Sequence, residues 1–163
     1  MIEVINTGGT FNKRYNPLNG ELEVPKDCLA IEDILNKAMC VNQKIKITQI
    51  ISKDSLEFTK DDRKLLLKTI QNSNANKIIV VHGTDTMSKS AKFIAKNIKN
   101  KKIIFTGAMK PYEIEKVEAV SNFMMAFGFL QNGKNGVYIS MHGIVKKYDK
   151  IQKDYQKGIF YEK

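Results

Sequence analysis

The sequence predicts an α/β fold: a doubly wound, mostly parallel sheet with helices on both faces, a three-layer sandwich of the Rossmann or flavodoxin type. Short β-branched runs alternate along the chain with segments of helical periodicity. Two of these runs, 78–81 and 103–105, are apolar throughout, as is typical of strands that are buried on both faces. Strand, loop and helix follow one another repeatedly without a linker, so residues 1–163 are predicted to form a single domain.

The length and composition of the chain restrict the kinds of protein it can be. With 163 residues, of which 42% are hydrophobic, it can bury a core without needing a disulfide or a metal ion to fold. No apolar run approaches the ~20 residues that span a bilayer. The first residues lack a basic segment followed by a long apolar one, so no secretion signal is expected. These features predict a cytoplasmic, globular protein without a membrane anchor.

The first half of the chain is expected to contain two strands and two helices. Residues 2–6 form the first strand, which ends at a pair of glycines, and the polar stretch 12–19 predicts a long loop or hairpin. Helical periodicity covers 29–39, and 46–51 has the β-branched composition of a strand. Thr59 precedes Asp62 by three residues, a capping-box spacing that predicts the start of a second helix.

The second half continues the alternation of strands and helices. A strand at 78–81 is followed by a helix from about 86 to 98. The next strand, 103–105, is followed by a helix from about 115 to 130 and by a fifth strand at 136–140. The remaining residues show no pattern that assigns them to a helix or a strand.

The net charge of +10 raises the question of an anionic partner, because 27 lysines and arginines stand against 17 acidic residues. Only Arg14 and Arg63 are arginines, and arginine is the residue best suited to contact phosphates and bases. The lysines are scattered, with small clusters at 99–102 and 146–147. We interpret them as a solvated surface and do not expect nucleic-acid binding, which stays the alternative interpretation.

The cysteines and histidines show no metal or redox signature. Cys28 and Cys40 have neither the spacing of a zinc pair nor that of a redox dithiol, so they are expected to be ordinary reduced thiols. His82 and His142 are isolated from each other and from the cysteines in the sequence. We therefore predict no metal site and no cofactor.

Polar loops follow the predicted strands. Ligands bind at the carboxyl ends of the strands in a doubly wound sheet, so these loops are expected to meet at one edge. Their glycine, hydroxyl and carboxylate groups predict a site for a small polar ligand, although turn and helix-cap chemistry explains each loop taken singly. No nucleotide-binding glycine motif and no GxSxG motif is present. The loops are 6–10, 52–54, 82–86 and 106–111.

Three of these loops together resemble motifs of the bacterial-type L-asparaginase family. They are Thr7-Gly8-Gly9-Thr10, His82-Gly83-Thr84-Asp85-Thr86-Met87 and Gly107-Ala108-Met109-Lys110-Pro111. The order and the approximate separation of the motifs are those of the family. The resemblance extends over nearly the whole chain but covers only the family's larger N-terminal domain, so the smaller C-terminal domain is expected to be missing.

The resemblance implies hydrolysis of the side-chain amide of asparagine, and often of glutamine, to the acid and ammonia without a metal or cofactor. A threonine hydroxyl attacks the amide carbon, and it needs a neighbouring base or a favourable field to do so. Carried over by motif, Thr10 is the nucleophile, and Thr84 and Asp85 form a second catalytic group with a lysine. Lys153 matches the position of that lysine, and nearby alternatives are Lys146, Lys147 and Lys150.

The resemblance also implies residues that orient the nucleophile and bind the substrate. Tyr15 is the candidate for the family's loop tyrosine that orients the first threonine. Ser52 matches the position that binds the substrate α-carboxylate, and Asp85 the one that pairs with its α-ammonium. Lys53 stands where the family often has glutamine, so the preference for asparagine or glutamine stays open. The implied substrate-binding residues are Gly9, Ser52, Lys53, Thr84, Asp85 and Ala108.

Three functions are therefore consistent with the sequence. The main hypothesis is an asparaginase-like amidohydrolase acting on a small amino acid, with a homo-oligomer expected by resemblance. In the family, a neighbouring subunit's C-terminal domain lends an acidic residue to the first threonine, and this chain is not expected to supply it. The alternatives are a catalytically weak or inactive homologue that binds an amino acid, and an amidotransferase component that supplies ammonia to a partner.

Overall fold

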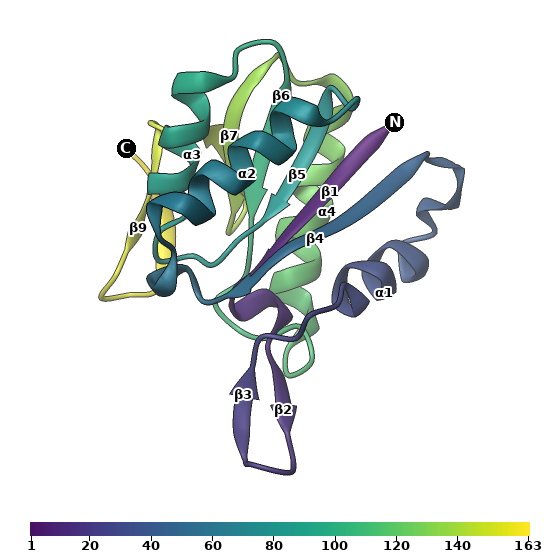
Figure 1. The fold of residues 1–163 in the computed structure, drawn as a ribbon, viewed down its shortest axis with the longest axis vertical. Coiled ribbons are helices and arrows are strands. Elements are labelled where there is room, and N and C mark those ends of the chain that lie inside the picture. The colour runs from purple at the N-terminus through teal and green to yellow at the C-terminus, as the bar shows by residue number, and fades with distance from the viewer.

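The computed structural model describes residues 1–163 and has a six-stranded sheet at its centre (Figure 1). The strand order is β4-β1-β5-β6-β7-β8. Adjacent strands are parallel except β8, which runs antiparallel to β7 at one edge. The sheet is thus mostly parallel, as predicted. Its strands are β1 (Ile2–Gly8), β4 (Ile45–Lys53), β5 (Lys77–Val81), β6 (Lys102–Thr106), β7 (Gly136–Met141) and β8 (Ile144–Lys147).

Helices cover both faces of the sheet, which confirms the predicted three-layer architecture. Helices α2 (Lys60–Asn72) and α3 (Met87–Asn97) pack on one face. Helices α1 (Leu29–Lys37) and α4 (Lys116–Asn132) pack on the other. None of the helices combines the length and the apolar character that crossing a bilayer requires.

The continuous apolar run of β5 follows directly from this layering. Ile78 and Val80 belong to the core under α2 and α3, whereas Ile79 and Val81 belong to the core under α1 and α4. Successive side chains of a strand point to opposite faces, and here both faces are covered, so no position calls for a polar residue.

Helix α2 begins at the residues that the capping-box spacing indicated. The Thr59 side chain accepts a hydrogen bond from Asp62 N, and the Asp62 carboxylate accepts one from Thr59 N, which together make a capping box. Aspartate can replace the usual glutamate here because its shorter side chain still reaches the N-cap backbone, at 2.8 Å.

Two hairpins lie outside the central sheet. The polar stretch after β1 forms β2 (Arg14–Asn16) and β3 (Glu21–Glu23), which project from the body of the molecule (Figure 1). The end of the chain, for which the sequence pattern gives no assignment, forms β9 (Ile151–Asp154) and β10 (Ile159–Glu162). Each of these last strands buries a single apolar residue in the core beside α3, too few to produce a recognisable alternation.

Two of the three lysines in the cluster at 99–102 are not on the solvated surface that the sequence predicted, whereas Lys99 is exposed as expected. Lys101 and Lys102 are buried, at 8% and 7% exposure. The Lys101 ammonium donates to the carbonyls of Ser73 and Ala75, just after α2, and the Lys102 ammonium donates to Leu130 O in the last turn of α4. Carbonyls at the C-terminal end of a helix lack partners and carry partial negative charge, which explains why these two lysines are buried.

The order of the strands determines where a ligand can approach the sheet. From β1 the chain crosses first to β4 on one side and then to β5 on the other, so the direction of the connections reverses between β1 and β5. Such a reversal leaves a crevice at the carboxyl ends of the two strands, where ligands bind in open α/β sheets. The loops 7–10 and 82–86 lie at this point.

Candidate active site

The loops after β1 and β5 are in direct backbone contact. Gly9 has a φ of 78°, in the left-handed region, and a Cβ placed on it would lie 2.5 Å from Gly83 N. Thr10 follows Gly9 and Thr84 follows Gly83, so this contact brings the two threonine-bearing segments side by side. Ser55, after β4, packs on the other side of Gly83, where a Cβ would lie 2.7 Å from the Ser55 side chain.

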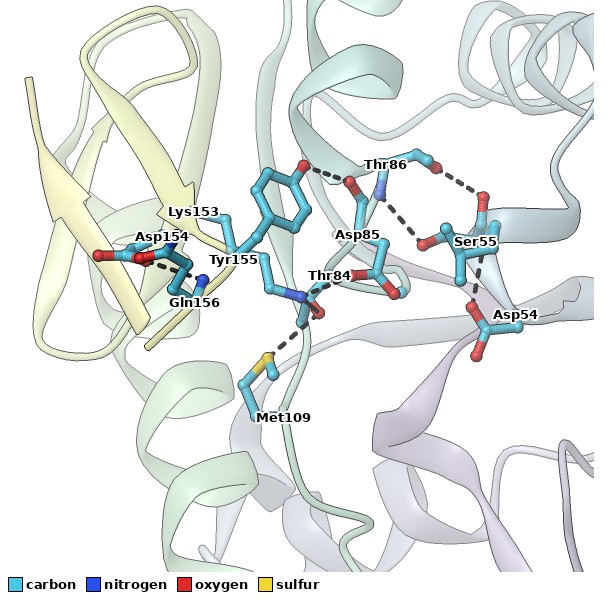
Figure 2. Close-up of polar contacts among 12 residues, drawn as sticks. Asp54, Ser55, Thr84, Asp85, Thr86, Met109, Lys153, Asp154, Tyr155 and Gln156 are labelled. Atoms are coloured by element: carbon cyan, nitrogen blue, oxygen red, sulfur yellow. Dashed lines mark hydrogen bonds and ion pairs between the residues drawn. The ribbon is translucent and has the colours of Figure 1, made fainter. Parts of the chain in front are cut away.

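Lys153 joins Thr84 and Asp85 at the centre of the candidate site. Its Nζ lies 2.9 Å from Thr84 Oγ1 and 2.7 Å from Asp85 Oδ1, as Figure 2 shows. The lysine extends from β9, and its side chain is only 6% exposed, whereas that of Asp85 is 31% exposed. The next aromatic residue, Tyr155, donates from its hydroxyl to Asp85 O at 2.8 Å and places its ring 5.3 Å from the lysine Nζ. The hairpin is therefore fixed to the loop after β5.

The Thr84 hydroxyl has a defined orientation. It accepts from Lys153 and donates to the sulfur of Met109 at 3.3 Å. An ammonium group at this distance stabilises negative charge that develops on the oxygen. The backbone N–H groups of Thr84 and Asp85 make no hydrogen bond within the chain, and α3 begins shortly afterwards, so this loop offers free donors to an anionic ligand group.

Thr10 is presented on a fixed turn with its own hydroxyl unpaired. It begins the short 3-10 helix η1 (Thr10–Asn12) and is half-buried, and its hydroxyl makes no hydrogen bond to the rest of the chain. Phe11 is fully buried in the core, and Asn12 Nδ2 donates to Gly8 O at 2.7 Å and to Asn6 Oδ1 at 2.9 Å. The following residues thus hold the turn, while the Thr10 hydroxyl stays available.

Tyr15 makes no hydrogen bond to Thr10. It lies on β2 of the projecting hairpin and is 57% exposed, with its hydroxyl beside Gly20. Its backbone N–H donates to Glu113 at 3.0 Å, which ties the hairpin to the loop before α4. The orienting role implied for Tyr15 by resemblance stays a prediction.

Three of the implied substrate-binding residues make no hydrogen bond to Thr84 or Asp85. The Ser52 hydroxyl accepts from Gln49 Nε2 at 2.8 Å. The Lys53 ammonium pairs with Asp62 in the first turn of α2, at 2.9 Å. Ala108 is buried at 1% exposure, in the core under α1 and α4. The substrate-binding role that the resemblance implies for these three residues stays a prediction.

Ser55 is the residue after β4 that the sequence motifs did not single out. Its Oγ accepts from Thr86 N at 3.2 Å, and its carbonyl accepts from Thr86 Oγ1 at 2.7 Å (Figure 2). Ser55 is fully buried, so it fixes the loop after β5 from behind. The signal that could have found it is Asp54, whose side chain accepts from Leu56 N and starts a turn directly after the strand.

The alternative lysines do not reach the site. Lys146 pairs with Glu162 on β10, at 2.8 Å. Lys147 and Lys150 are exposed and form no ion pair. Among the four lysines considered from the sequence, Lys153 alone contacts Thr84 and Asp85.

Comparison with known proteins agrees with this geometry. The model of the asparaginase N-terminal domain family matches residues 1–157. The chain belongs to the asparaginase family. Its sequence is 24% identical, over 163 residues, to an L-asparaginase of Thermococcus kodakarensis, and the match covers 96% of this chain and 48% of that protein. The solved structure of the thermostable L-asparaginase from the same organism superposes with a TM-score of 0.84 and 22% identity, covering 99% of this chain and 50% of that one.

Two further relatives differ in what they are described to do. The chain is 29% identical over 144 residues to a glutamyl-tRNA(Gln) amidotransferase subunit of Nanoarchaeum equitans, covering 85% of this chain and 36% of that protein. A probable cytoplasmic L-asparaginase from Campylobacter jejuni has the same fold, with a TM-score of 0.80, 21% identity and coverage of 99% and 52%. The chain thus spans half or less of the length of the curated relatives it matches.

In this asparaginase-family chain, His82 anchors the site loop from inside the core. It is fully buried, and its Nδ1 lies 2.8 Å from Gly83 O, which can only accept a hydrogen bond, so Nδ1 carries the proton. Nε2 accepts from Ser90 Oγ at 2.9 Å, and Ser90 in turn accepts from Arg63 Nε at 3.1 Å. Arg63 also donates to Thr86 Oγ1, so the network supports both ends of the loop.

Burial lowers the pKa of His82 from 6.5 to about 4, because a charged imidazole has no water around it. The unfolded chain binds a proton at this group below pH 6.5, whereas the folded chain does so only below about 4. The contribution of His82 to the free energy of unfolding should therefore rise by roughly 3 kcal/mol between pH 4 and pH 6.5 and change no further above pH 6.5. Urea unfolding across this range, compared with His82→Gln, isolates the contribution. If the His82 imidazole itself titrates near pH 6.5 by NMR in the folded chain, the lowered pKa of this group is refuted.

A second network links the two groups that contact the Thr84 hydroxyl. Glu118, in α4, accepts from Met109 N at 2.7 Å and from Lys110 N at 3.1 Å. Its Oε1 also lies 2.8 Å from Nε2 of His142, whose Nδ1 accepts from Phe160 N in β10. Phe160 is directly opposite Lys153 in the hairpin. One carboxylate thus holds the Met109 loop and, through His142, the hairpin that carries the lysine.

Glu118→Ala should lower the free energy of unfolding by about 2 to 3 kcal/mol, because two backbone N–H groups and an imidazole lose a charged acceptor in a mostly buried position. Urea unfolding measures this change. Glu57→Ala is the matched control, since Glu57 is exposed and its side chain makes no hydrogen bond, and it should change the value by less than about 0.5 kcal/mol. Equal effects of the two substitutions would show that Glu118 does not hold the loop.

Proposed function

We propose that the chain is an asparaginase-type amidohydrolase, which cleaves the side-chain amide of L-asparagine, and of L-glutamine as a second substrate, to the acid and ammonia. The observation that carries this proposal is the position of the Lys153 ammonium, within hydrogen-bond distance of both Thr84 and Asp85. Membership of the asparaginase family supports it. A buried lysine on a threonine hydroxyl, at the switch point of a parallel sheet, suits the activation of a hydroxyl group.

The proposed reaction has two steps. The Thr10 hydroxyl oxygen bonds to the side-chain amide carbon and loses its proton, the carbon–nitrogen bond breaks, and ammonia leaves with that proton. Water then attacks the resulting ester, releases the acid and restores the hydroxyl. Thr84, Asp85 and Lys153 assist by stabilising negative charge on oxygen, and the free N–H groups of the Thr84 loop supply donors for the oxyanion.

Substrate recognition follows from charge. Asp85 is partly exposed and carries the negative charge suited to the α-ammonium of an amino acid. The Ser52 hydroxyl accepts from Gln49 Nε2 and its own proton has no acceptor in the chain, so it is the donor proposed for the α-carboxylate, whereas the Lys53 ammonium pairs with Asp62. The relative described as cytoplasmic supports the same location for this chain, and a homo-oligomer is proposed from the family resemblance.

A second candidate function is the supply of ammonia within an amidotransferase. The match over 144 residues to an amidotransferase component favours it. In that case the same site hydrolyses an amide, but its activity depends on a partner protein. Co-purification of such a partner, together with ammonia release only in its presence, distinguishes this function from that of a free-standing amidohydrolase.

Ammonia release from L-asparagine and L-glutamine by the purified chain tests the main proposal. We expect release by the wild type and none by Thr10→Ala, with an unchanged melting temperature because the Thr10 hydroxyl makes no hydrogen bond in the chain. If neither substrate yields ammonia but calorimetry detects binding of asparagine or aspartate, the chain is an inactive homologue that holds an amino acid. If there is neither turnover nor binding, both interpretations are wrong.

A further inference from the structure

A basic groove lies between α2 and α3, and the proposed reaction does not use it. The groove has a volume of about 450 Å³. The lysines that line it lie at i,i+3 and i,i+4 spacings within each helix, so each helix presents its lysines on one face. These two faces border the groove, although the first and last of the lysines are 36 positions apart in the sequence. No carboxylate lines the groove, and its cationic residues are Lys60, Lys64, Lys89, Lys92, Lys96 and Arg63.

The positive charge of the groove is largely uncompensated. Lys64 pairs with Asp61, but both side chains are well exposed, so this pair neutralises little of the field. The other four lysines form no ion pair, and α3 contains no acidic residue. Beneath them, Arg63 is 6% exposed and donates only to the uncharged oxygens of Ser90, Phe58, Thr59 and Thr86. The nearest carboxylate is that of Asp62, which pairs with Lys53 instead, so the buried guanidinium adds to the attraction for an external anion.

The floor of the groove is aromatic. Phe93 is half-buried between the lysines of α3, and Phe58, which is almost completely buried, lines the same groove. Lys89 and Lys96 are seven residues apart, which places them roughly 10 Å apart along the helix. Cations arranged over this length, with an exposed part of an aromatic ring between them, match a chain of phosphates that carries planar bases. An acidic peptide would pair with the lysines of the groove but would have no planar base to stack on the Phe93 ring.

We propose that the groove between α2 and α3 binds single-stranded nucleic acid, with the lysines on the phosphates and a base against Phe93. This inference is independent of the proposed hydrolase function, because the groove shares no substrate-contacting residue with the Thr84 site. Contacts of this kind do not distinguish one base sequence from another, and the affinity they provide falls steeply as the salt concentration rises. The sequence alone does not predict nucleic-acid binding, because the five lysines lie in two separate segments and come together only in the folded chain.

Fluorescence anisotropy with a labelled oligouridylate of about 12 nucleotides tests the proposal. The wild type should bind with a micromolar dissociation constant at about 100 mM salt. Lys89→Glu/Lys92→Glu should weaken binding at least tenfold and reduce the slope of log affinity against log salt by roughly 1.4. The matched control is Lys134→Glu/Lys147→Glu, which changes net charge equally on lysines outside the groove and should weaken binding less than threefold.

Phe93→Leu tests the aromatic part of the site and should weaken binding of the oligonucleotide about fivefold, without affecting displacement of the label by inorganic polyphosphate. Thermal unfolding verifies that each variant is folded. Three results would overturn the proposal: no binding at about 50 mM salt, equal weakening by the two lysine pairs, or equal competition by polyglutamate. The last result would indicate an acidic protein segment as the ligand.

Discussion

Lys153→Met should lower the rate of ammonia release from L-asparagine by roughly 100- to 10,000-fold, the range typical of a group that assists proton transfer. Methionine matches the lysine side chain as far as Cε but lacks the ammonium that contacts Thr84 Oγ1 at 2.9 Å. The fold should tolerate it, because Asp85 is 31% exposed and water can replace its lost partner. The melting temperature of the variant, measured beside its turnover, separates the two effects.

Lys157→Met is the matched control for this prediction. Lys157 lies on the same hairpin, is exposed and forms no ion pair, so its loss should leave turnover within about twofold of the wild type. Turnover of Lys153→Met close to that of Lys157→Met would show that the lysine contact with Thr84 is structural only.

Gly9→Ala should be the most destabilising single substitution in the candidate site. A methyl group at Gly9 would lie 2.5 Å from Gly83 N and 2.6 Å from Gly83 Cα, and the backbone already has a φ of 78°. The left-handed conformation costs roughly 1–2 kcal/mol for a residue with a Cβ, and the overlap with backbone adds roughly 1–3 kcal/mol. The expected loss of roughly 2–5 kcal/mol corresponds to a drop of about 10 °C in melting temperature.

Two other glycines separate the components of this effect. Gly143 has a φ of 83° but open space around its Cβ position, so Gly143→Ala should show the conformational strain alone, about 1 kcal/mol. Gly128 lies in α4 with nothing within 4 Å and no positive φ, so Gly128→Ala should stabilise the chain by about 0.5–1 kcal/mol. If Gly9→Ala were no worse than Gly143→Ala, the loops after β1 and β5 would not be in contact.

Local patterns were sufficient to predict the five parallel strands of the central sheet and the helices that cover it. The alternation of apolar runs and helical segments indicated the parallel sheet, and the fully apolar run of β5 indicated the two covering layers. The Thr59–Asp62 spacing located the start of α2 because capping depends on neighbours in sequence. By contrast, β9 and β10 each depend on one apolar residue that packs in the core, Ile151 and Phe160. These contacts are with residues distant in sequence, so no short stretch of sequence predicts them.

The candidate site was predicted less completely, for identifiable physical reasons. The pairing of β1 with β4 shifts register between Asn6 and Gly8, opposite the end of β4. Such an irregularity changes which side chains point toward the crevice, and this explains why Ser55 rather than Ser52 supports the Thr84 loop. The burial of Lys101 and Lys102 depends on carbonyls near the ends of two helices that are distant in sequence.

The most direct test of the central claim is the conversion of L-asparagine to aspartate by Thr84→Val and Thr84→Ser. Valine keeps the shape of the side chain but removes the oxygen that Lys153 and Met109 contact, whereas serine retains it. We predict that the wild type and Thr84→Ser form aspartate and that Thr84→Val, although folded, forms none above background. Undiminished formation of aspartate by Thr84→Val would contradict the assignment of amide hydrolysis to this site.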